Sequence, residues 1–307
     1  MNEATLHPTP AWPAAARAQF QAVGIALRRE LVTIGGLILV LSVGILIARL
    51  RGVLHTPMHI SPDDFGLVLG LIGFIAPLAI WKSEGPSSRG YFWSMPLPRG
   101  PHTMIKVLGG WVWLLLTLTI LMAWFGLQAW LSGGGLGIDQ TRLVLVNGAV
   151  PPATPPHEIA KALGGMVDPA LLREVRWRTP AWLWLVPFAA PTVAYFAGTI
   201  AAIRSDHPWR WLVAPFLAFL VFRLLAEAAN LRTLADVGEQ IIAGPYGLET
   251  LFSGSNESAW MLKTTSGAEV RVWRDLAEPA RWLATLALWG LPALAGVVLA
   301  ARRHGEH

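Results

Sequence analysis

The chain has 307 residues, of which 54% are hydrophobic and 14% charged, with a formal net charge of +5 and no cysteine. A soluble domain carries about 25% charged residues, so this composition excludes an ordinary soluble protein and predicts one that crosses a membrane several times. The absence of cysteine excludes disulfides and thiolate metal sites. The basic residues, mostly arginine, lie at the ends of apolar runs. This is typical of a topology signal, so nucleic acid is not expected as a partner.

The segment before the first apolar run predicts a disordered start and one helix. Residues 1–10 carry no helical pattern, and no cleavable signal peptide is expected, because the first apolar run is long and begins far from the N-terminus. Between Ala11 and Glu30, one helical face would carry Arg17, Gln21 and Arg28. The other face would be apolar and consist of Trp12, Ala16, Phe20, Val23 and Leu27. We predict an amphipathic helix lying in the membrane interface; the alternative is a helix packed against the protein itself.

Six apolar runs approach or reach the length that a helix needs to cross about 30 Å of hydrocarbon. The predicted spans are Leu31–Leu50, Phe65–Ile80, Val107–Leu127, Ala181–Ile203, Trp211–Ala229 and Trp282–Ala301. Several tryptophans lie near their ends, as in an aromatic belt. We therefore predict an all-α polytopic membrane protein with six transmembrane helices.

The charges between the spans predict the orientation. Both chain ends would lie on one side with the segments 81–106 and 204–210, and this side holds eleven basic against five acidic residues. The rest of the chain holds thirteen basic against fourteen acidic residues. The positive-inside rule thus places both termini in the cytoplasm. The expected units are the start and interfacial helix (1–30), spans one to three (31–130), an outer segment (131–180), spans four and five (181–229), a second outer segment (230–280), and the last span with its tail (281–307).

The two outer segments are too long to be simple connections, since loops beyond about 12–15 residues usually have a structure or function of their own. In the first, Arg142–Val146 alternates as a strand. Pro156–Leu163 and Asp168–Val175 are predicted as short helices, the second with Asp168 as N-cap and Pro169 in its first turn.

In the second outer segment, Trp260–Lys263 and Glu269–Trp273 alternate around Gly267 and predict a hairpin. We expect both segments to form one small mixed α/β cap outside the membrane. The alternative is two independent loops.

Motifs for chemistry are missing from the sequence. There is no G-x-x-x-x-G-K-[ST] and no G-x-G-x-x-G after a strand, so the chain is not expected to hydrolyse ATP. Neither H-E-x-x-H nor a serine nucleophile elbow is present, and the histidines are scattered. We expect no catalytic activity, no cofactor and no metal in this chain.

Charged residues inside a span indicate a functional site by default. Arg223 and Glu227 are four residues apart in the fifth predicted span and would share one helix face. They would line a substrate route. The alternative is that they form an ion pair with each other near the outer interface, or that they contact the cap. Gly66 and Gly70 form a G-x-x-x-G in the second span, which permits a close helix approach.

The loop 81–106 carries a distinctive series of residues. Glu84 is followed by a link rich in glycine and serine, then by Tyr91–Arg99, which reads YFWSMPLPR, and by Lys106 at the start of the third span. The loop resembles that of the permease subunits of type-2 ATP-binding-cassette (ABC) exporters. In that family it reads roughly as an acid, a Gly/Ser stretch, an apolar run, LP-x-[ST]-R, and a lysine before the next span.

The match is partial in its details. Pro96, Arg99 and Lys106 agree with the family pattern, whereas Met95 replaces the usual leucine and Pro98 the small hydroxyl residue. The interfacial helix, the six spans and the cytoplasmic termini also resemble the family layout, over nearly the whole chain. The long outer segments depart from small members of the family, and they favour an extracytoplasmic partner or a cap that shields substrate.

The resemblance implies that the loop forms a coupling helix that docks on a cytoplasmic ATPase subunit, which binds ATP and Mg²⁺. The implied coupling residues are Glu84, Tyr91, Phe92, Trp93, Pro96, Arg99 and Lys106. Aromatic and arginine residues are typical interface anchors; the alternative for the three aromatic residues is anchoring at the membrane surface. A second permease subunit, identical or related, and a location in a bacterial cytoplasmic membrane are also implied.

These features together predict the transmembrane subunit of an ABC exporter. The alternative is a membrane-embedded interaction or mechanotransmission protein, whose outer cap contacts other envelope components without moving a solute. A membrane enzyme acting on lipid ranks behind both, because no acid/base or metal cluster is present. The substrate stays open among lipid, peptide, drug and glycan.

Overall fold

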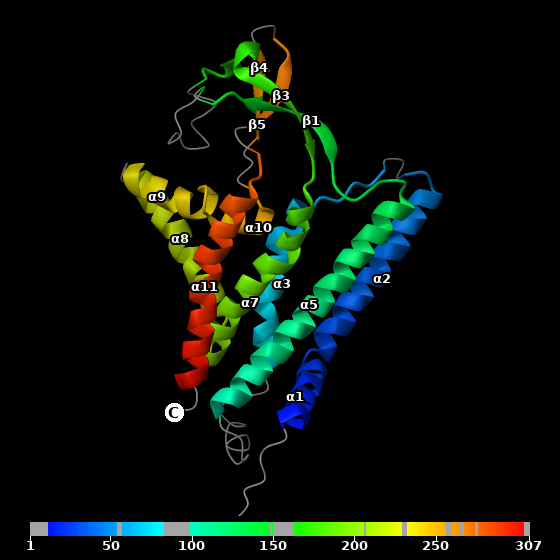
Figure 1. Cartoon of the computed structure of the whole chain (residues 1–307), viewed down its shortest axis with the longest axis vertical. Helices are drawn as coiled ribbons and strands as arrows, with labels where there is room; N and C mark the ends of the chain where they lie inside the picture. The colour runs from blue at the N-terminus through cyan, green and yellow to red at the C-terminus, as the bar shows by residue number, and fades with distance from the viewer. Residues whose placement is uncertain are drawn as a thin grey trace, which may run out of the picture.

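The computed structural model consists mainly of helices, with a small sheet at one end (Figure 1). It describes residues 12–53, 57–82, 99–147, 149, 163–205, 207–228, 232–255, 259–264, 267–273 and 276–303. The helices are α1 Trp12–Ala26, α2 Arg28–Leu50, α3 Gly66–Trp81, α5 Arg99–Leu131, α7 Val186–Arg204, α8 Arg210–Ala228, α9 Arg232–Ala243, α10 Leu248–Ser253 and α11 Pro279–Arg303. Single 3₁₀ turns cover Pro62–Phe65, Pro169–Leu171 and Ala181–Leu185.

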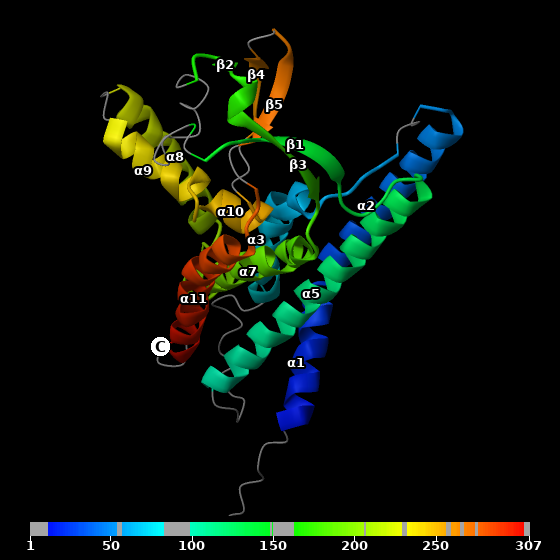
Figure 2. The same ribbon diagram turned by 45° about the horizontal axis from the view of Figure 1, so that its top comes forward.

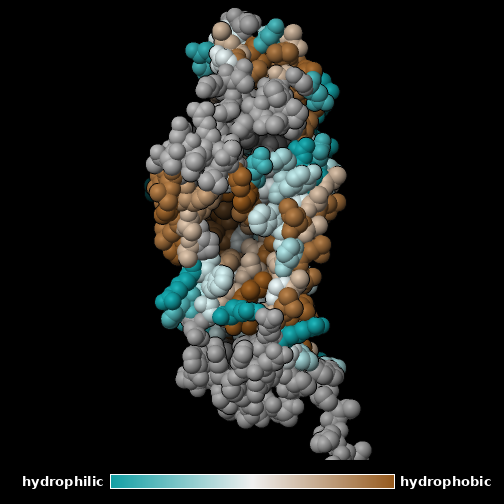
Figure 3. Space-filling view, turned by 90° about the vertical axis from the view of Figure 1, so that its left-hand side faces the viewer, coloured by the Kyte–Doolittle hydropathy of each residue, from teal (hydrophilic) through white to brown (hydrophobic). Residues whose placement is uncertain are grey.

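Four helical segments in the described part of the chain are long and apolar enough to cross a membrane. They are Arg28–Leu50, Gly100–Leu131, Ala181–Arg204 and Pro279–Arg302. They correspond to the first, third, fourth and sixth predicted spans. The second and fifth correspond to α3, a shorter apolar helix of 16 residues, and to α8, of 19 residues. The face that carries α8 and α11 has a hydrophobic surface across its middle, with hydrophilic side chains above and below it (Figure 3).

The helices α3 and α7 pack with their backbones in close approach. A Cβ atom on Gly73 of α3 would overlap the carbonyl oxygen of Pro191, and a Cβ atom on Gly198 of α7 would overlap that of Phe74. Each helix therefore needs a glycine where the other crosses it. The predicted G-x-x-x-G does not serve this contact, because Gly66 and Gly70 face Phe252 of α10.

The helix α1 packs on the protein through one face and is exposed on the other. Val23 of α1 and Leu27, the residue between α1 and α2, are buried, and Trp113 of α5 donates its indole N–H to the carbonyl oxygen of Phe20 at 3.0 Å. Arg17 on the opposite face is exposed. Part of the predicted apolar face, from Phe20 to Leu27, thus packs against the protein, whereas Ala16 is exposed. The position of the helix in the membrane interface stays a prediction.

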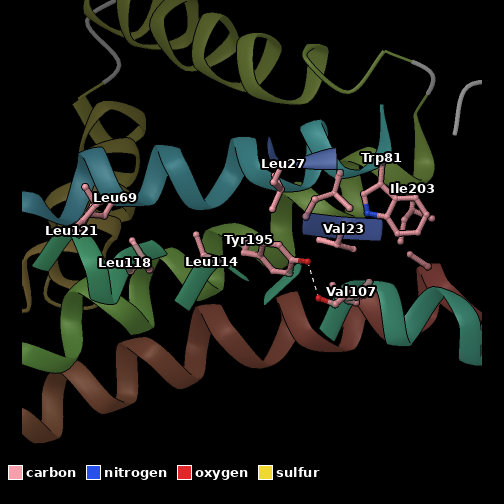
Figure 4. Packing of buried hydrophobic residues seen from close by; sticks show 13 residues of the cluster. Val23, Leu27, Leu69, Trp81, Val107, Leu114, Leu118, Leu121, Tyr195 and Ile203 are labelled. Atoms are coloured by element: carbon pink, nitrogen blue, oxygen red, sulfur yellow. Dashed lines mark hydrogen bonds between the residues drawn. The ribbon is translucent and has the colours of Figure 1, made fainter. Parts of the chain in front are cut away.

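Hydrophobic residues of α1, α3, α5, α7 and α11 meet in one cluster, shown from nearby in Figure 4. Its buried members are Val23, Leu27, Leu69, Ile80, Trp81, Val107, Leu114, Leu118, Leu121, Tyr195, Ile203, Val297 and Ala300. The helix α2 contributes no buried residue and runs beside α5 (Figures 1 and 2). The side chains Trp124 and Ser42 connect these two helices by a hydrogen bond of 2.8 Å.

The sheet combines strands from both long polar segments. The strands are β1 Asp139–Leu145, β2 Met166–Val167, β3 Leu172–Arg178, β4 Ala259–Thr264 and β5 Glu269–Trp273, in the order β2-β4-β5-β1-β3. The two segments meet twice, where β1 pairs with β5 and where β2 pairs with β4, both in parallel. They form one sheet, not two independent loops, and the predicted hairpin of β4 and β5 is confirmed.

The predicted helix at Asp168–Val175 is wrong. Asp168 caps a single 3₁₀ turn by accepting a hydrogen bond from the backbone N–H of Ala170 at 2.9 Å. The chain then continues as β3, which pairs with β1 over its whole length. Asp168 does act as a cap, but pairing with a distant strand determines the structure of the residues after the turn. The helix predicted at 156–163 lies outside the described residues except for Leu163.

Candidate functional site

The stems of the loop 81–106 come together at one end of the helix bundle. Trp81 is the last residue of α3, and Lys106 lies near the start of α5. The Nζ atom of Lys106 is 4.3 Å from the centre of the Trp81 ring, and the two residues are only 6% and 8% exposed. An ammonium group over an indole face is attracted by the ring's quadrupole, and more strongly when water is excluded. Lys106 therefore contacts the interior of its own chain.

A second contact fixes the start of α5 to α7. The hydroxyl group of Tyr195 donates a hydrogen bond of 2.7 Å to the carbonyl oxygen of Val107, and the tyrosine is fully buried (Figure 4). Gly110, one turn further along α5, leaves room for the ring, since a Cβ atom there would overlap the Tyr195 hydroxyl group. A buried tyrosine needs a partner for its hydroxyl group, and here the backbone provides it.

A third set of contacts joins the same end of α5 to α1. The side chains of Gln19 and His102 are hydrogen-bonded, and further along α5 the ring of Trp113 stacks on Phe20 with 5.0 Å between centroids. The first turns of α5 are thus held by α1, α3 and α7 together. A displacement of the loop would reach all three helices through α5.

The structure describes only some of the predicted coupling residues. Glu84, Tyr91, Phe92, Trp93 and Pro96 lie outside the described residues. Arg99 begins α5, but its side chain is outside the described part, so Lys106 is the member whose contacts are defined. Of the predicted path residues, Arg223 and Glu227 lie one turn apart in α8, and their side chains also fall outside it.

Two residues of this site are not singled out by the sequence. Tyr195 carries a detectable signal, a hydroxyl group inside an apolar run, which has to be satisfied within the bundle. The sequence indicates Trp81 only as a belt residue, because its contact with Lys106 depends on how α3 and α5 meet.

The sheet contains a separate buried cation. The guanidinium carbon of Arg142 in β1 lies 4.7 Å from the ring centre of Trp177 in β3 and 5.0 Å from that of Trp273 in β5. Arg142 is 6% exposed. Because β1 and β3 come from one polar segment and β5 from the other, this arginine braces the β1–β5 junction, one of two between the segments.

The sheet also carries an exposed ion pair. Arg176 of β3 forms a two-pronged salt bridge with Asp139 of β1, with a shortest distance of 2.9 Å. The hydrogen bonds from Arg176 lower the pKa of the Asp139 carboxyl group below its ordinary value. Within the ranges that the structure describes, no three His, Asp or Glu residues are grouped so that they could hold a metal ion.

Comparisons with known proteins give no relative: no family model, no curated protein and no solved structure matches the chain. The function is therefore argued from the residues and their geometry.

Proposed function

We propose that the chain is the transmembrane permease subunit of an ATP-driven ABC transporter, working as an exporter in a bacterial cytoplasmic membrane. The observation that carries this proposal is the loop 81–106, with its family-like residues and stems fixed by Lys106 on Trp81. A loop that receives force from a partner is effective only if its stems are joined firmly to the helices that must move.

Six transmembrane helices complete this arrangement. In addition to the four long apolar helices, α8 would span about 28 Å at 1.5 Å per residue, and α3 about 24 Å, extended by the turn at Pro62–Phe65. Large apolar side chains of α8 are exposed, among them Leu217, Leu220 and Leu224. Lipid or a second permease subunit would cover them. Both termini and the loop 81–106 would then lie in the cytoplasm, with the sheet on the outer side.

In the proposed mechanism, a separate ATPase subunit binds ATP and Mg²⁺ and closes. The movement reaches the loop, then α3 and α5 through their stems, and α7 and α1 through Tyr195 and Trp113. Substrate would pass at the interface of two permease subunits, with Arg223 and Glu227 on its route. The chain itself performs no covalent chemistry.

A second candidate function is favoured by the sheet. Five strands from two distant segments, braced at Arg142, form more structure than a connection between spans requires. In this alternative, the sheet contacts an envelope component and the chain transmits conformational change without moving a solute.

The test is co-purification of the intact wild-type protein from its native membrane in several mild detergents, followed by identification of the proteins that accompany it. An ABC ATPase among them supports the proposal. Its absence in every detergent would overturn it. Co-purified ATPase activity that no candidate solute stimulates, together with an envelope protein that binds through the sheet, would favour the second function.

A further inference from the structure

An apolar groove lies where α1, α2 and α5 meet, on the outside of the helix bundle. It is an open groove with a volume of about 580 Å³. In Figures 1 and 2, α1 and α2 follow one another end to end, and α5 runs beside them. Its lining is almost entirely apolar and includes Gln21, Gly24, Ile25, Arg28, Val32 and Trp113.

One wall of the groove is held in place by its own contacts. Trp113 stacks on Phe20 with an angle of 15° between the rings and donates to the Phe20 carbonyl oxygen at 3.0 Å. The ring can approach because residue 24 is glycine: a Cβ atom there would lie 2.7 Å from the Trp113 ring, which is too close. The apolar side chains at the opening, Ile25 and Val32, are 74% and 67% exposed. The groove is thus a preformed apolar surface that nothing in the described chain covers.

Among the residues that line the groove, the charged one is Arg28; the acidic Glu30 in the same turn of α2 is not among them. Arg28 lines the groove at the start of α2, where the chain changes from polar residues to the apolar run that begins at Leu31. Arg17 lies at helical spacing from Gln21 on the exposed face of α1. An anionic lipid would match both features: its acyl chain suits the apolar groove, and its phosphate suits an arginine at the level where a span enters the hydrocarbon.

We propose that the groove binds an anionic phospholipid, with the phosphate beside Arg28 and one acyl chain against Leu31 and Val32 on the span side of it. A guanidinium group suits a phosphate because its N–H donors match two phosphate oxygens. The proposal requires only that α2 crosses a bilayer. The assignment to the cytoplasmic leaflet rests on the proposed function. A lipid in this groove would contact α1, α2 and α5 at once and so hold α5 against α1 at the level of Trp113.

The test is native mass spectrometry of the full-length protein in a non-ionic detergent. Phosphatidylglycerol or phosphatidylcholine with identical acyl chains is added at equal concentration. The wild type is expected to retain phosphatidylglycerol about five-fold more than phosphatidylcholine. The Arg28→Gln variant should lose this preference. Arg29→Gln, which removes the same charge from the neighbouring exposed residue, should keep it.

Further measurements distinguish binding of the whole lipid from binding of its headgroup alone and from nonspecific binding. Val32→Trp fills the groove and should reduce retention of both lipids, whereas millimolar glycerol phosphate should displace neither. Equal retention of the two lipids by the wild type would overturn the proposal. So would an equal loss in Arg28→Gln and Arg29→Gln, or displacement by glycerol phosphate. None of these readouts depends on an ATPase, so this proposal and the exporter role fail separately.

Discussion

Lys106 and Trp81 are in contact across the base of the loop that separates them in the sequence, with 4.3 Å between Nζ and the ring centre. The contact joins the end of α3 to the start of α5 inside a buried cluster. The two ends of the loop 81–106 are thus fixed to one another, and in the proposed function a push on the loop would move α3 and α5 together. The proposed coupling depends on this attachment.

Loss of the Lys106 charge should destabilise the bundle. Lys106→Met keeps most of the side chain's volume but removes the cation, and Trp81→Leu removes the ring. A buried cation–π contact is worth about 2 kcal/mol. A double-mutant cycle of thermal unfolding in detergent should therefore give a coupling free energy of about 1–2 kcal/mol between the two positions. Lys82→Met, at an exposed neighbour, should change little. A coupling energy near zero would show that the two residues act independently.

The contact between Gly110 and Tyr195 predicts a specific rescue. Gly110→Ala places a Cβ atom on the Tyr195 hydroxyl group and should cost about 1–3 kcal/mol by overpacking. Tyr195→Phe alone should cost about 1 kcal/mol for the lost hydrogen bond to Val107. The double variant should be more stable than the two costs added together, because the hydroxyl group that meets the new methyl group is gone.

The control for this pair is Gly36→Ala in α2, where a Cβ atom would meet nothing within 4 Å. Its unfolding temperature should stay at or above that of the wild type. Strictly additive costs for Gly110→Ala and Tyr195→Phe would refute the proposed close packing.

Arg142 should be the cation on which the sheet depends most. Arg142→Met removes the charge from between Trp177 and Trp273, and we expect a loss of about 2 kcal/mol in sheet stability. Limited proteolysis should then cut the segments that form the sheet faster than in the wild type. Arg173→Met, at an exposed position of β3, should leave the cleavage rate unchanged. Equal cleavage of both variants would contradict the brace.

Acid should weaken the sheet through Asp139. Its pKa in the folded chain is below the unfolded value, mainly because Arg176 donates hydrogen bonds to the carboxylate. The stabilisation is therefore complete above the unfolded pKa and is lost as the pH falls through the lowered folded pKa. The pair is exposed, so the effect should be small and should shrink at high salt. An NMR titration of Asp139 should show the lowered pKa, and Arg176→Gln should return it toward the ordinary range. An unchanged pKa in that variant would contradict the assignment.

The helices could be predicted from the sequence because an apolar run of sufficient length is a local signal. The start of α5 at Arg99, ahead of the apolar run, could not, since its first turns are stabilised by contacts with α1 and α3. The strand β3 is predicted as a helix for a similar reason: its pairing with β1 is not visible near Asp168.

Contacts between distant segments account for the remaining differences. The place of Lys106 over Trp81, and of Arg142 between two tryptophans, depends on how helices cross and on which strands are neighbours. Spacing within one segment does not contain this information. The partner of Gly66 and Gly70 could not be predicted for the same reason, and it is Phe252 in a short helix far along the chain.

Coupling of this chain to an ATPase through residues of the loop 81–106 can be measured directly by co-purification from the native membrane. The proteins to compare are the wild type, the Glu84→Ala/Arg99→Ala double variant, and the Arg173→Ala control. We predict that an ABC ATPase accompanies the wild type and the control and is lost from the double variant. An ATPase that accompanies all three would show that these two residues do not couple the chain, and an ATPase that accompanies none would contradict the transporter itself.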